Sequence, residues 1–188
     1  VRVTADAVPV AIHDPDLQRV TGRRGRVKSM TWQQLKERPL KDGKGVPRLD
    51  DLLAAWPDLR WNIDVKERQA IGPVVQAISR TGSKGRVLVA SFSGRRAARV
   101  SAVVGPGVAT GAGRWTVAAL VGSKMAPFVR LHPRAAAAQV PMARKGIRIV
   151  DEAFVRACHR AGLAVHVWTI DDPIVIGRLL DLGVDGIM

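Results

Sequence analysis

The 188-residue sequence predicts an α/β fold, a TIM (β/α)8 barrel that is incomplete in this chain. From residue 59 onward, six short apolar runs alternate with helical patterns and are joined by short loops. This alternation is typical of βα units and of a parallel sheet. Several of the runs also end in polar side chains, and in a barrel the carboxyl ends of the strands converge on one cleft. A doubly wound sheet shares the alternation, but the polar strand ends favour the barrel.

The chain begins with an expected hairpin and a loop insertion that together fill residues 1–58. Two extended arms, Val1–Thr4 and Val8–Ile12, flank Ala5-Asp6-Ala7. Residues 14–58 then carry several glycines and little apolar material, so we expect an inserted region of loops and short helices within a single domain, 1–188. One short helix is expected from Thr31, a suitable N-cap, to Arg38, and another from Leu49 to Trp56.

The rest of the chain follows a regular rhythm of strands and helices. The six expected strands are Leu59–Lys66, Arg86–Phe92, Val108–Gly111, Ala136–Met142, Ala164–Ile170 and Val184–Met188. The expected helices between them are Ile71–Thr81, Gly94–Val104, Arg114–Val121, Val150–Ala161 and Pro173–Leu182. Six strands are two fewer than a closed (β/α)8 barrel requires.

The first of these strands carries the most informative polar residues. Successive side chains of a strand point to opposite faces, so Asn62, Asp64 and Lys66 share one face. Ile63 and Val65 share the other face, which we expect to be buried. A carboxylate and an ammonium group therefore lie side by side at the carboxyl end of this strand, where barrels hold their ligands.

Three other predicted strand ends carry polar or aromatic side chains. His13 precedes Asp14 at the end of the hairpin arm, Ser91 ends the strand after Asp64, and Trp168 ends the Ala164 strand. Each of these alone has a more common structural role, as a turn pair, a helix cap or a core aromatic. Their shared position at strand ends is what indicates one functional cleft.

Composition sets further bounds on the class of protein. An apolar content of 47% suits a well-buried domain, and no apolar run reaches the ~18 residues of a membrane span. Cys158 is the only cysteine, so an intramolecular disulfide is impossible, and its helical pattern predicts a small buried side chain. The chain lacks an N-terminal signal pattern, which favours a cytoplasmic location, but it starts at Val1, so an upstream segment with or without a targeting signal stays open.

The charge is strongly basic, at +14, and unevenly distributed. Residues 19–48 hold ten Lys/Arg, and residues 101–150 hold seven with no acidic residue. Such a balance suits a phosphate-bearing partner, and it leaves open a non-enzymatic basic module that binds nucleic acid or anionic lipid. The absence of tyrosine and the presence of only three phenylalanines argue against nucleic acid, because stacking aromatics are lacking.

Several motifs, in order, give the chain a family resemblance. Val3–Asp14 resembles the segment "T-x-D-G-x-P-V-x-x-H-D" of the glycerophosphodiester phosphodiesterase family, and Asn62–Lys66 resembles its "I-E-x-K" strand. The smaller matches are Leu17, Arg19 and Thr21 to "L-x-R-x-T", Val46–Leu49 to "I-P-T-L", Ser91-Phe92 to "S-F", Trp168-Thr169 to "W-T" and Gly183–Ile187 to the last strand.

The resemblance implies a TIM barrel that hydrolyses glycerophosphodiesters to an alcohol and glycerol 3-phosphate. It further implies a divalent cation, Ca²⁺ or Mg²⁺, held by carboxylates, and two histidines for acid–base catalysis. By the same resemblance His13 is catalytic, Asp64 is a metal ligand, and Lys66, Trp168 and Ser91 bind the substrate, a small phosphodiester. A phosphodiesterase acting on sphingolipid or inositol lipid head groups stays an alternative.

The departures from the family pattern matter as much as the matches. The family's first strand ends in "H-R-G", and its second carries "E-x-D" just before the position of Val1; neither is present, so the resemblance implies that the first two barrel strands are largely missing. The family's "T-D-x-P" after the last strand is also absent, and Asp64, Ala7 and Arg48 replace Glu, Gly and Thr. We therefore expect a fragment with a weak, single-carboxylate metal site and little or no activity.

Overall fold

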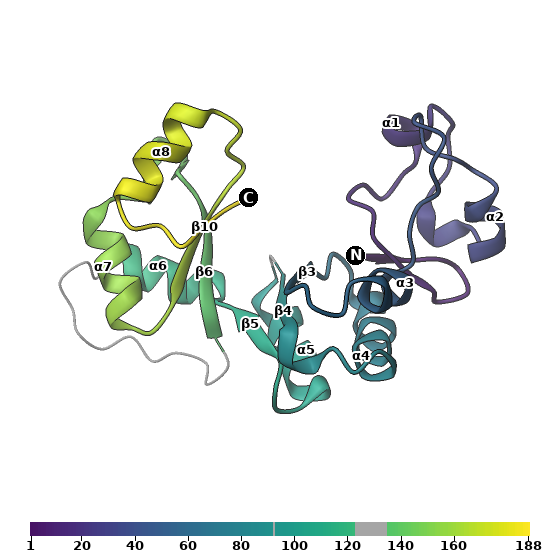
Figure 1. Cartoon of the computed structure of the whole chain (residues 1–188), viewed down its shortest axis with the longest axis horizontal. Coiled ribbons are helices and arrows are strands. Elements are labelled where there is room, and N and C mark those ends of the chain that lie inside the picture. The colour runs from purple at the N-terminus through teal and green to yellow at the C-terminus, as the bar shows by residue number, and fades with distance from the viewer. Residues whose placement is uncertain (92, 123–134) are drawn as a thin grey trace. The chain divides into compact units, whose positions relative to one another are not determined.

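The structure is a computed structural model that describes residues 1–91, 93–122 and 135–188. The chain divides into two compact units (Figure 1). The first comprises Val1–Ser91 and Arg95–Val108, and the second is built around Ala109–Met188. Both units contain parallel strands that alternate with helices, as predicted. The expected strand end at Phe92 lies outside the described residues, and the assignment of 1–188 to a single domain stays a prediction.

The first unit opens with the predicted hairpin. Strands β1 (Arg2–Val3) and β2 (Pro9–Val10) pair antiparallel. In the turn between them, the Asp6 carboxylate accepts a hydrogen bond from the Thr4 hydroxyl at 2.5 Å and another from the Trp32 backbone N–H at 2.9 Å. Because Trp32 is the first residue of helix α2 (Trp32–Lys36), Asp6 ties the hairpin turn to that helix.

The insertion contains short helices and a small core of its own. Its elements are α1 (Gln18–Thr21), a 3-10 turn (Val27–Ser29), α2, and α3 (Leu49–Ala55). Thr31 is the N-cap of α2, as predicted, and forms a reciprocal capping box with Gln34. Buried apolar residues from the hairpin and the insertion pack together: Val10, Ile12, Leu17, Val27, Leu35 and Val46. The insertion is therefore more ordered than its glycine-rich sequence indicates.

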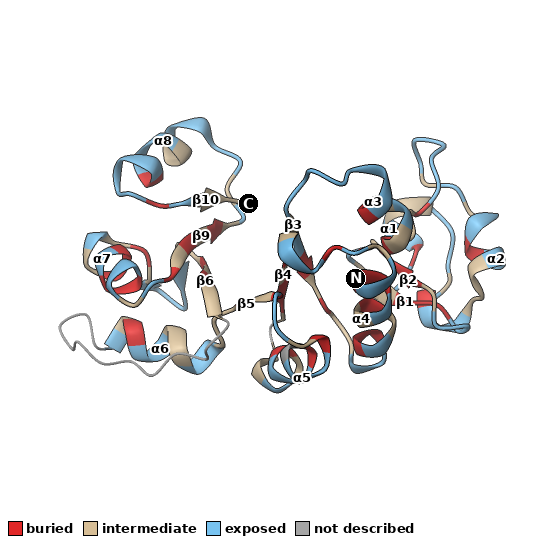
Figure 2. Cartoon of the chain, turned by 60° about the horizontal axis from the view of Figure 1, so that its bottom comes forward, coloured by how far each residue is buried: buried red, intermediate tan, exposed pale blue. Residues whose placement is uncertain are grey.

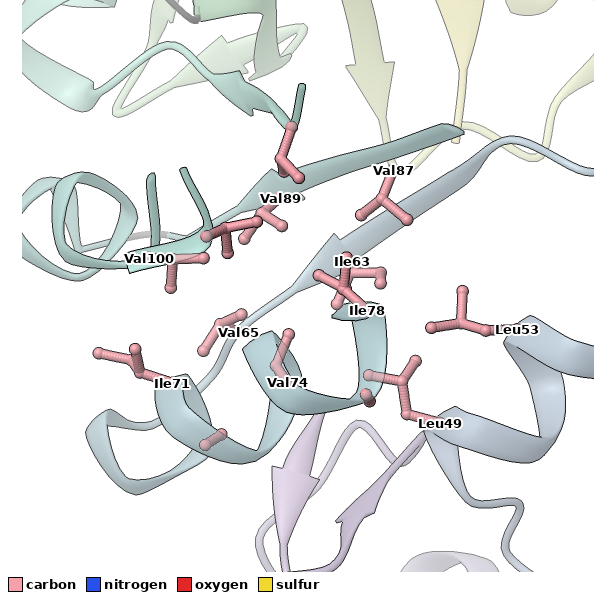
Figure 3. Packing of buried hydrophobic residues seen from close by; sticks show 14 of the residues in the cluster. Leu49, Leu53, Ile63, Val65, Ile71, Val74, Ile78, Val87, Val89 and Val100 are labelled. Atoms are coloured by element: carbon pink, nitrogen blue, oxygen red, sulfur yellow. The ribbon is translucent and has the colours of Figure 1, made fainter. Parts of the chain in front are cut away.

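A parallel pair of strands covered by helices forms the main core of the first unit. Strand β3 (Trp61–Asp64) pairs with β4 (Val87–Ala90), with Asp64 opposite Ala90. Helix α4 (Ile71–Arg80) turns Ile71, Val74 and Ile78 toward these strands (Figure 3). Helix α5 (Gly94–Val104) adds Val100 to the same cluster. The regular strand is shorter than the predicted 59–66, and Leu59, which precedes it, is exposed.

The beginning of the chain lies beside the end of β3. The Val1 nitrogen donates to the Asp64 carbonyl, and the Lys66 N–H donates to the Val1 carbonyl at 3.2 Å. In a parallel pair of strands, one residue donates to the carbonyl of a residue on the neighbouring strand and accepts from the N–H two positions further along that strand. Val1 has this pattern with Asp64 and Lys66. Val1 therefore occupies the place of a parallel neighbour of β3, where the family resemblance locates the end of the preceding strand.

In its described residues, the second unit contains four parallel strands and the helices that cover them. The strands are β5 (Ala109–Gly111), β6 (Ala135–Pro141), β9 (Ala164–Trp168) and β10 (Gly186–Ile187), hydrogen-bonded in that order. The helices are α6 (Arg114–Gly122), α7 (Glu152–Arg160) and α8 (Pro173–Asp181). Asp151 and Asp172 cap the last two helices by accepting hydrogen bonds from backbone N–H groups.

The core of the second unit forms between its sheet and these helices. Val165 and Val167 of β9 pack against α7, and Figure 2 shows red, buried positions along these elements. Cys158 of α7 is fully buried in this cluster, as predicted, and burial raises the pKa of its thiol to about 12. A small hairpin, β7 (Ala143–Arg144) with β8 (Ile147–Arg148), was not predicted.

Candidate functional site

Asp64 and Lys66 meet at the carboxyl end of β3, as the alternation of the strand predicts. Ile63 and Val65 turn into the core, and the opposite face carries the two charged side chains. The Asp64 Oδ2 atom lies 2.7 Å from the Lys66 Nζ atom, and the side chains are 31% and 15% exposed. The result is a partly buried ion pair at a strand end.

The second carboxylate oxygen of Asp64 has a different environment. Asp64 Oδ1 is buried and has no hydrogen-bond partner among the described residues. An unpaired buried charged oxygen is costly, so such an atom marks a place where a ligand would be stabilising. Hard divalent cations prefer carboxylate oxygens, so Asp64 fits as one ligand. Within the described ranges, no group of three His, Cys, Asp or Glu side chains is placed to hold a metal ion.

Two side chains hold the backbone that follows β3. The Ser91 hydroxyl donates to the Val65 carbonyl at 2.9 Å. The Arg96 guanidinium, from α5, donates to the Lys66 carbonyl. Ser91 thus acts on the loop that presents Lys66, in addition to any contact with substrate. This role of Arg96 was not predicted, because the residue that it contacts lies 30 positions away in the sequence. The arginines of helix α5 are evident in the sequence, but they do not identify the group that each one contacts.

His13 belongs to a chain of three polar side chains. Its Nδ1 atom lies 2.7 Å from Asp14 Oδ1, and Asp14 Oδ2 lies 2.5 Å from the Nε atom of Arg19. The hydrogen bonds from Arg19 and then from His13 lower the pKa of Asp14 to about 2. A carboxylate can only accept, so the Nδ1 atom of His13 must carry a hydrogen. The ring is 74% exposed, and its Nε2 atom has no recorded partner in the described part of the chain.

Arg2 and Glu67 connect the His13 segment to the end of β3. The Arg2 Nε atom donates to the His13 carbonyl at 3.0 Å. The Arg2 Nη1 atom lies 3.5 Å from the Glu67 Oε2 atom, and Glu67 directly follows Lys66. The Glu67 Oε1 atom also accepts from the Val3 N–H at 2.8 Å. His13 is therefore tied to the Asp64–Lys66 pair through one arginine and one glutamate.

Trp168 lies in the second unit, at the end of β9. Ala164, His166 and Trp168 share the face of β9 opposite the buried Val165 and Val167. His166 lies 3.4 Å from Gln139 of β6, measured between Nδ1 and Nε2. Burial lowers the pKa of His166, against a smaller opposite effect of Asp185. Sequence reasoning singled out Trp168 but not His166, because a histidine in a strand has no distinctive local signal.

The structure brings together part of the predicted set. Asp64, Lys66 and Ser91 gather around the end of β3, and His13 is linked to them through Arg2 and Glu67. No contact between the His13 and Asp64 side chains is recorded among the described residues. Trp168 belongs to the other compact unit. Roles in catalysis, metal binding and substrate binding stay predictions for all five residues.

Comparison with known proteins gives a consistent result along the whole chain. The family model described as the glycerophosphoryl diester phosphodiesterase family matches residues 1–188. A curated relative from Mycobacterium tuberculosis, named "Probable glycerophosphodiester phosphodiesterase 2", is 39% identical over 193 residues. That alignment covers 100% of this chain and 73% of the relative.

Solved structures confirm the predicted fold class, an incomplete barrel of α/β type. The glycerophosphoryl diester phosphodiesterase domain of an M. tuberculosis protein matches with a TM-score of 0.79 and 21% identity, over 100% of this chain and 82% of that one. A phosphodiesterase of Oleispira antarctica, solved with its product sn-glycerol-3-phosphate, matches with a TM-score of 0.78 and 19% identity, over 99% and 77%. Across the ranges described here, no helix is long and apolar enough to cross a bilayer.

Proposed function

The chain belongs to the glycerophosphoryl diester phosphodiesterase family, and we propose that it hydrolyses glycerophosphodiesters to an alcohol and glycerol 3-phosphate with a bound divalent cation. The proposal rests on the carboxylate of Asp64: one oxygen pairs with Lys66, and the other is buried and has no partner among the residues that the structure describes. The product bound to the Oleispira antarctica relative has the chemistry expected of such a reaction.

His13 is suited to protonate the leaving alcohol. In the reaction, water adds to phosphorus, the bond between phosphorus and the alcohol oxygen breaks, and that oxygen needs a proton. The Nδ1 atom of His13 is engaged by Asp14, so the Nε2 atom is the one that delivers the proton. Arg19 donates a hydrogen bond to the other carboxylate oxygen of Asp14 and so holds that carboxylate in place. The fixed carboxylate in turn limits the rotation of the His13 imidazole.

Asp64 and Lys66 are suited to hold the phosphate half of the substrate. The Oδ1 atom of Asp64 is the ligand we assign to Ca²⁺ or Mg²⁺. When bound, such a cation neutralises charge that develops on the phosphate oxygens. Lys66 adds a second positive charge beside it, and its position depends on Asp64, whose Oδ2 atom holds the ammonium group at 2.7 Å.

The remaining assigned residues contribute position and shape. The Ser91 hydroxyl supports the Val65 carbonyl and so the backbone from which Lys66 projects. We assign Trp168 to an apolar wall against the glycerol carbons, because a large, half-buried ring at a strand end is suited to that contact. These two roles affect substrate affinity more than the chemical step.

We propose further that this chain has low activity and binds its cation weakly. Cation affinity rises with the number of charged oxygen ligands, and Ca²⁺ takes about six to eight oxygens. Among the residues the structure describes, Asp64 is the only one assigned, and no cluster of three ligands accompanies it. Water and the substrate phosphate would have to complete the coordination.

The test is release of glycerol 3-phosphate by the purified 188-residue chain from a panel of glycerophosphodiesters, with Ca²⁺, Mg²⁺ or a chelator. We expect slow, cation-dependent release that Asp64→Asn abolishes. Asp58→Asn is the matched control, because Asp58 is an exposed carboxylate on the loop before β3. Sphingomyelin and phosphatidylinositol serve as substrates of the alternative classes.

Three results would contradict different parts of the proposal. Turnover that is as fast with the chelator as with the cation would remove the metal from the mechanism. Hydrolysis confined to sphingolipid or inositol lipid head groups would change the substrate class and leave the site intact. Equal loss in Asp64→Asn and Asp58→Asn would remove Asp64 from the site.

A further inference from the structure

A small cavity in the first unit is lined mainly by positive side chains. Its volume is about 180 Å³, and its walls are Arg2, Pro15, Arg26, Val27, Lys28 and Glu67. A water molecule in the liquid occupies ~30 Å³, so the space is sufficient for a small anionic group and a few waters. Three cations and one carboxylate give the walls a clear positive excess.

The one carboxylate of the cavity is already engaged. Glu67 accepts from the Val3 N–H and pairs with Arg2. Arg26 and Lys28 are both exposed, and in the described ranges neither forms an ion pair with a carboxylate. The positive charge of these two side chains is therefore not compensated within the cavity, which favours an anion there.

The backbone holds Arg26 and Lys28 in a defined place. The Leu17 N–H donates to the Gly25 carbonyl at 2.9 Å, and the Val27 N–H donates to the Pro15 carbonyl at 3.1 Å. Val27 itself is 1% exposed and anchored in the core of the insertion. The side chains on either side of Val27 therefore project from a fixed segment, so less conformational entropy is lost when they bind a ligand.

The cavity lies next to two of the residues assigned to the reaction. Pro15 is two residues after His13, and Glu67 directly follows Lys66. Arg2, which lines the cavity, donates to the His13 carbonyl. The group that His13 protonates is the leaving alcohol, so the space beside His13 is the space available to the rest of that alcohol.

We infer that this cavity binds a phosphate group carried by the alcohol half of the substrate. The guanidinium fork of Arg26 and the ammonium of Lys28 form charge-assisted hydrogen bonds to phosphate oxygens, and a choline or ethanolamine cation is repelled there. The chain then prefers diesters such as bis(glycerophospho)glycerol over glycerophosphocholine. The substrate preference rests on the proposed function, whereas the binding site itself does not.

The experiment measures binding by isothermal titration calorimetry to the 188-residue chain at low salt. The probes are inorganic phosphate, bis(glycerophospho)glycerol and glycerophosphocholine. The variant is Arg26→Gln/Lys28→Gln, which changes two exposed side chains and leaves Arg2 and its contact to His13 in place. The control is Lys36→Gln/Lys41→Gln, which removes the same charge from exposed positions outside the cavity.

We expect the Arg26→Gln/Lys28→Gln variant to bind inorganic phosphate and bis(glycerophospho)glycerol about tenfold or more weakly, since charge-assisted bonds are lost. Glycerophosphocholine binding should not weaken, and the control should resemble the wild type. An equal loss in the control, or no loss in the variant, overturns the site. Loss for inorganic phosphate but not for the diester overturns the substrate preference. If no diester is hydrolysed by any variant, the proposed function fails while the phosphate titrations still decide the site.

Discussion

Arg86 joins the end of α3 to the start of β4, and its removal gives a quantitative test of how the strand that carries Asp64 is supported. Its Nη1 atom donates to the Trp56 and Leu59 carbonyls at 3.0 and 3.1 Å. Its Nη2 atom donates to the Leu53 carbonyl at 2.5 Å and to the Ser83 hydroxyl at 2.8 Å. The guanidinium thus satisfies carbonyls at the carboxyl end of a helix, where a positive charge is favourable.

The change Arg86→Met keeps much of the aliphatic stem and removes all four hydrogen bonds. The two bonds from Nη2 are partly buried, and a hydrogen bond to a charged group contributes about 1.5 kcal/mol or more. The two bonds from Nη1 are exposed, where water replaces the donor with little loss. We therefore expect the free energy of unfolding to fall by about 3 kcal/mol, and the Tm of the 188-residue chain by roughly 6–12 °C.

Urea unfolding followed by tryptophan fluorescence measures this loss. Trp56 and Trp61, whose ring centroids lie 6.2 Å apart, report on the region around Arg86. Arg68→Met is the matched control, because Arg68 is exposed and has no recorded side-chain contact in the described ranges. A loss below about 1 kcal/mol, or one equal to that of the control, would show that water substitutes for the guanidinium at the helix end.

Three further changes test the backbone and the pH response. Ala7 has a φ of 61°, which costs a residue with a Cβ atom, so Ala7→Gly should raise the free energy of unfolding by about 0.5–1 kcal/mol in urea titrations; a decrease would contradict this. A Cβ atom at Gly186 would lie 2.8 Å from His166 Cδ2, so Gly186→Ala should lower the free energy of unfolding by about 1–2 kcal/mol. In the His166→Ala background the same change should cost much less, which a double-mutant cycle measures. Burial lowers the pKa of His166 in the folded chain below 6.5. As the pH falls through 6.5, the unfolded chain therefore takes up the proton first, and the free energy of unfolding decreases. Above pH 6.5 His166 is neutral in both states and does not change the stability. His166→Gln should therefore flatten the decline of the urea midpoint between roughly pH 8 and pH 5, and parallel profiles for the two proteins would rule this out.

Local patterns in the sequence were sufficient to locate the parallel strands and to assign the two faces of the strand that carries Asp64. Alternation put Ile63 and Val65 inside and Asp64 and Lys66 on the opposite face, and burial confirms both. Thr31 was recognised as an N-cap from its residue type and position. Each of these features depends on residues that are neighbours in the chain, so a period of two or a single cap residue is enough to reveal it.

Contacts between distant residues could not be predicted in the same way. The Asp6 carboxylate caps α2 from 26 residues away, and Arg96 reaches the Lys66 carbonyl from 30 residues away. The role of Arg86 likewise depends on partners in another element. A guanidinium or carboxylate has the same sequence signal whether it is solvated or bound to a backbone group, so only the fold distinguishes the two cases.

The two oxygens of Asp64 have different environments, so an ion pair and the proposed cation could share this one side chain. Asp64 replaces the family's Glu, yet its Oδ2 atom already lies 2.7 Å from the ammonium of Lys66 two residues on. The Oδ1 atom stays buried and has no partner in the described part of the chain. Each oxygen can then serve one partner, so coordination by Oδ1 does not require the ion pair to break. A cation held by Oδ1 would lie close to Lys66, because both positive charges would then contact the same carboxylate, and both could attract a substrate phosphate.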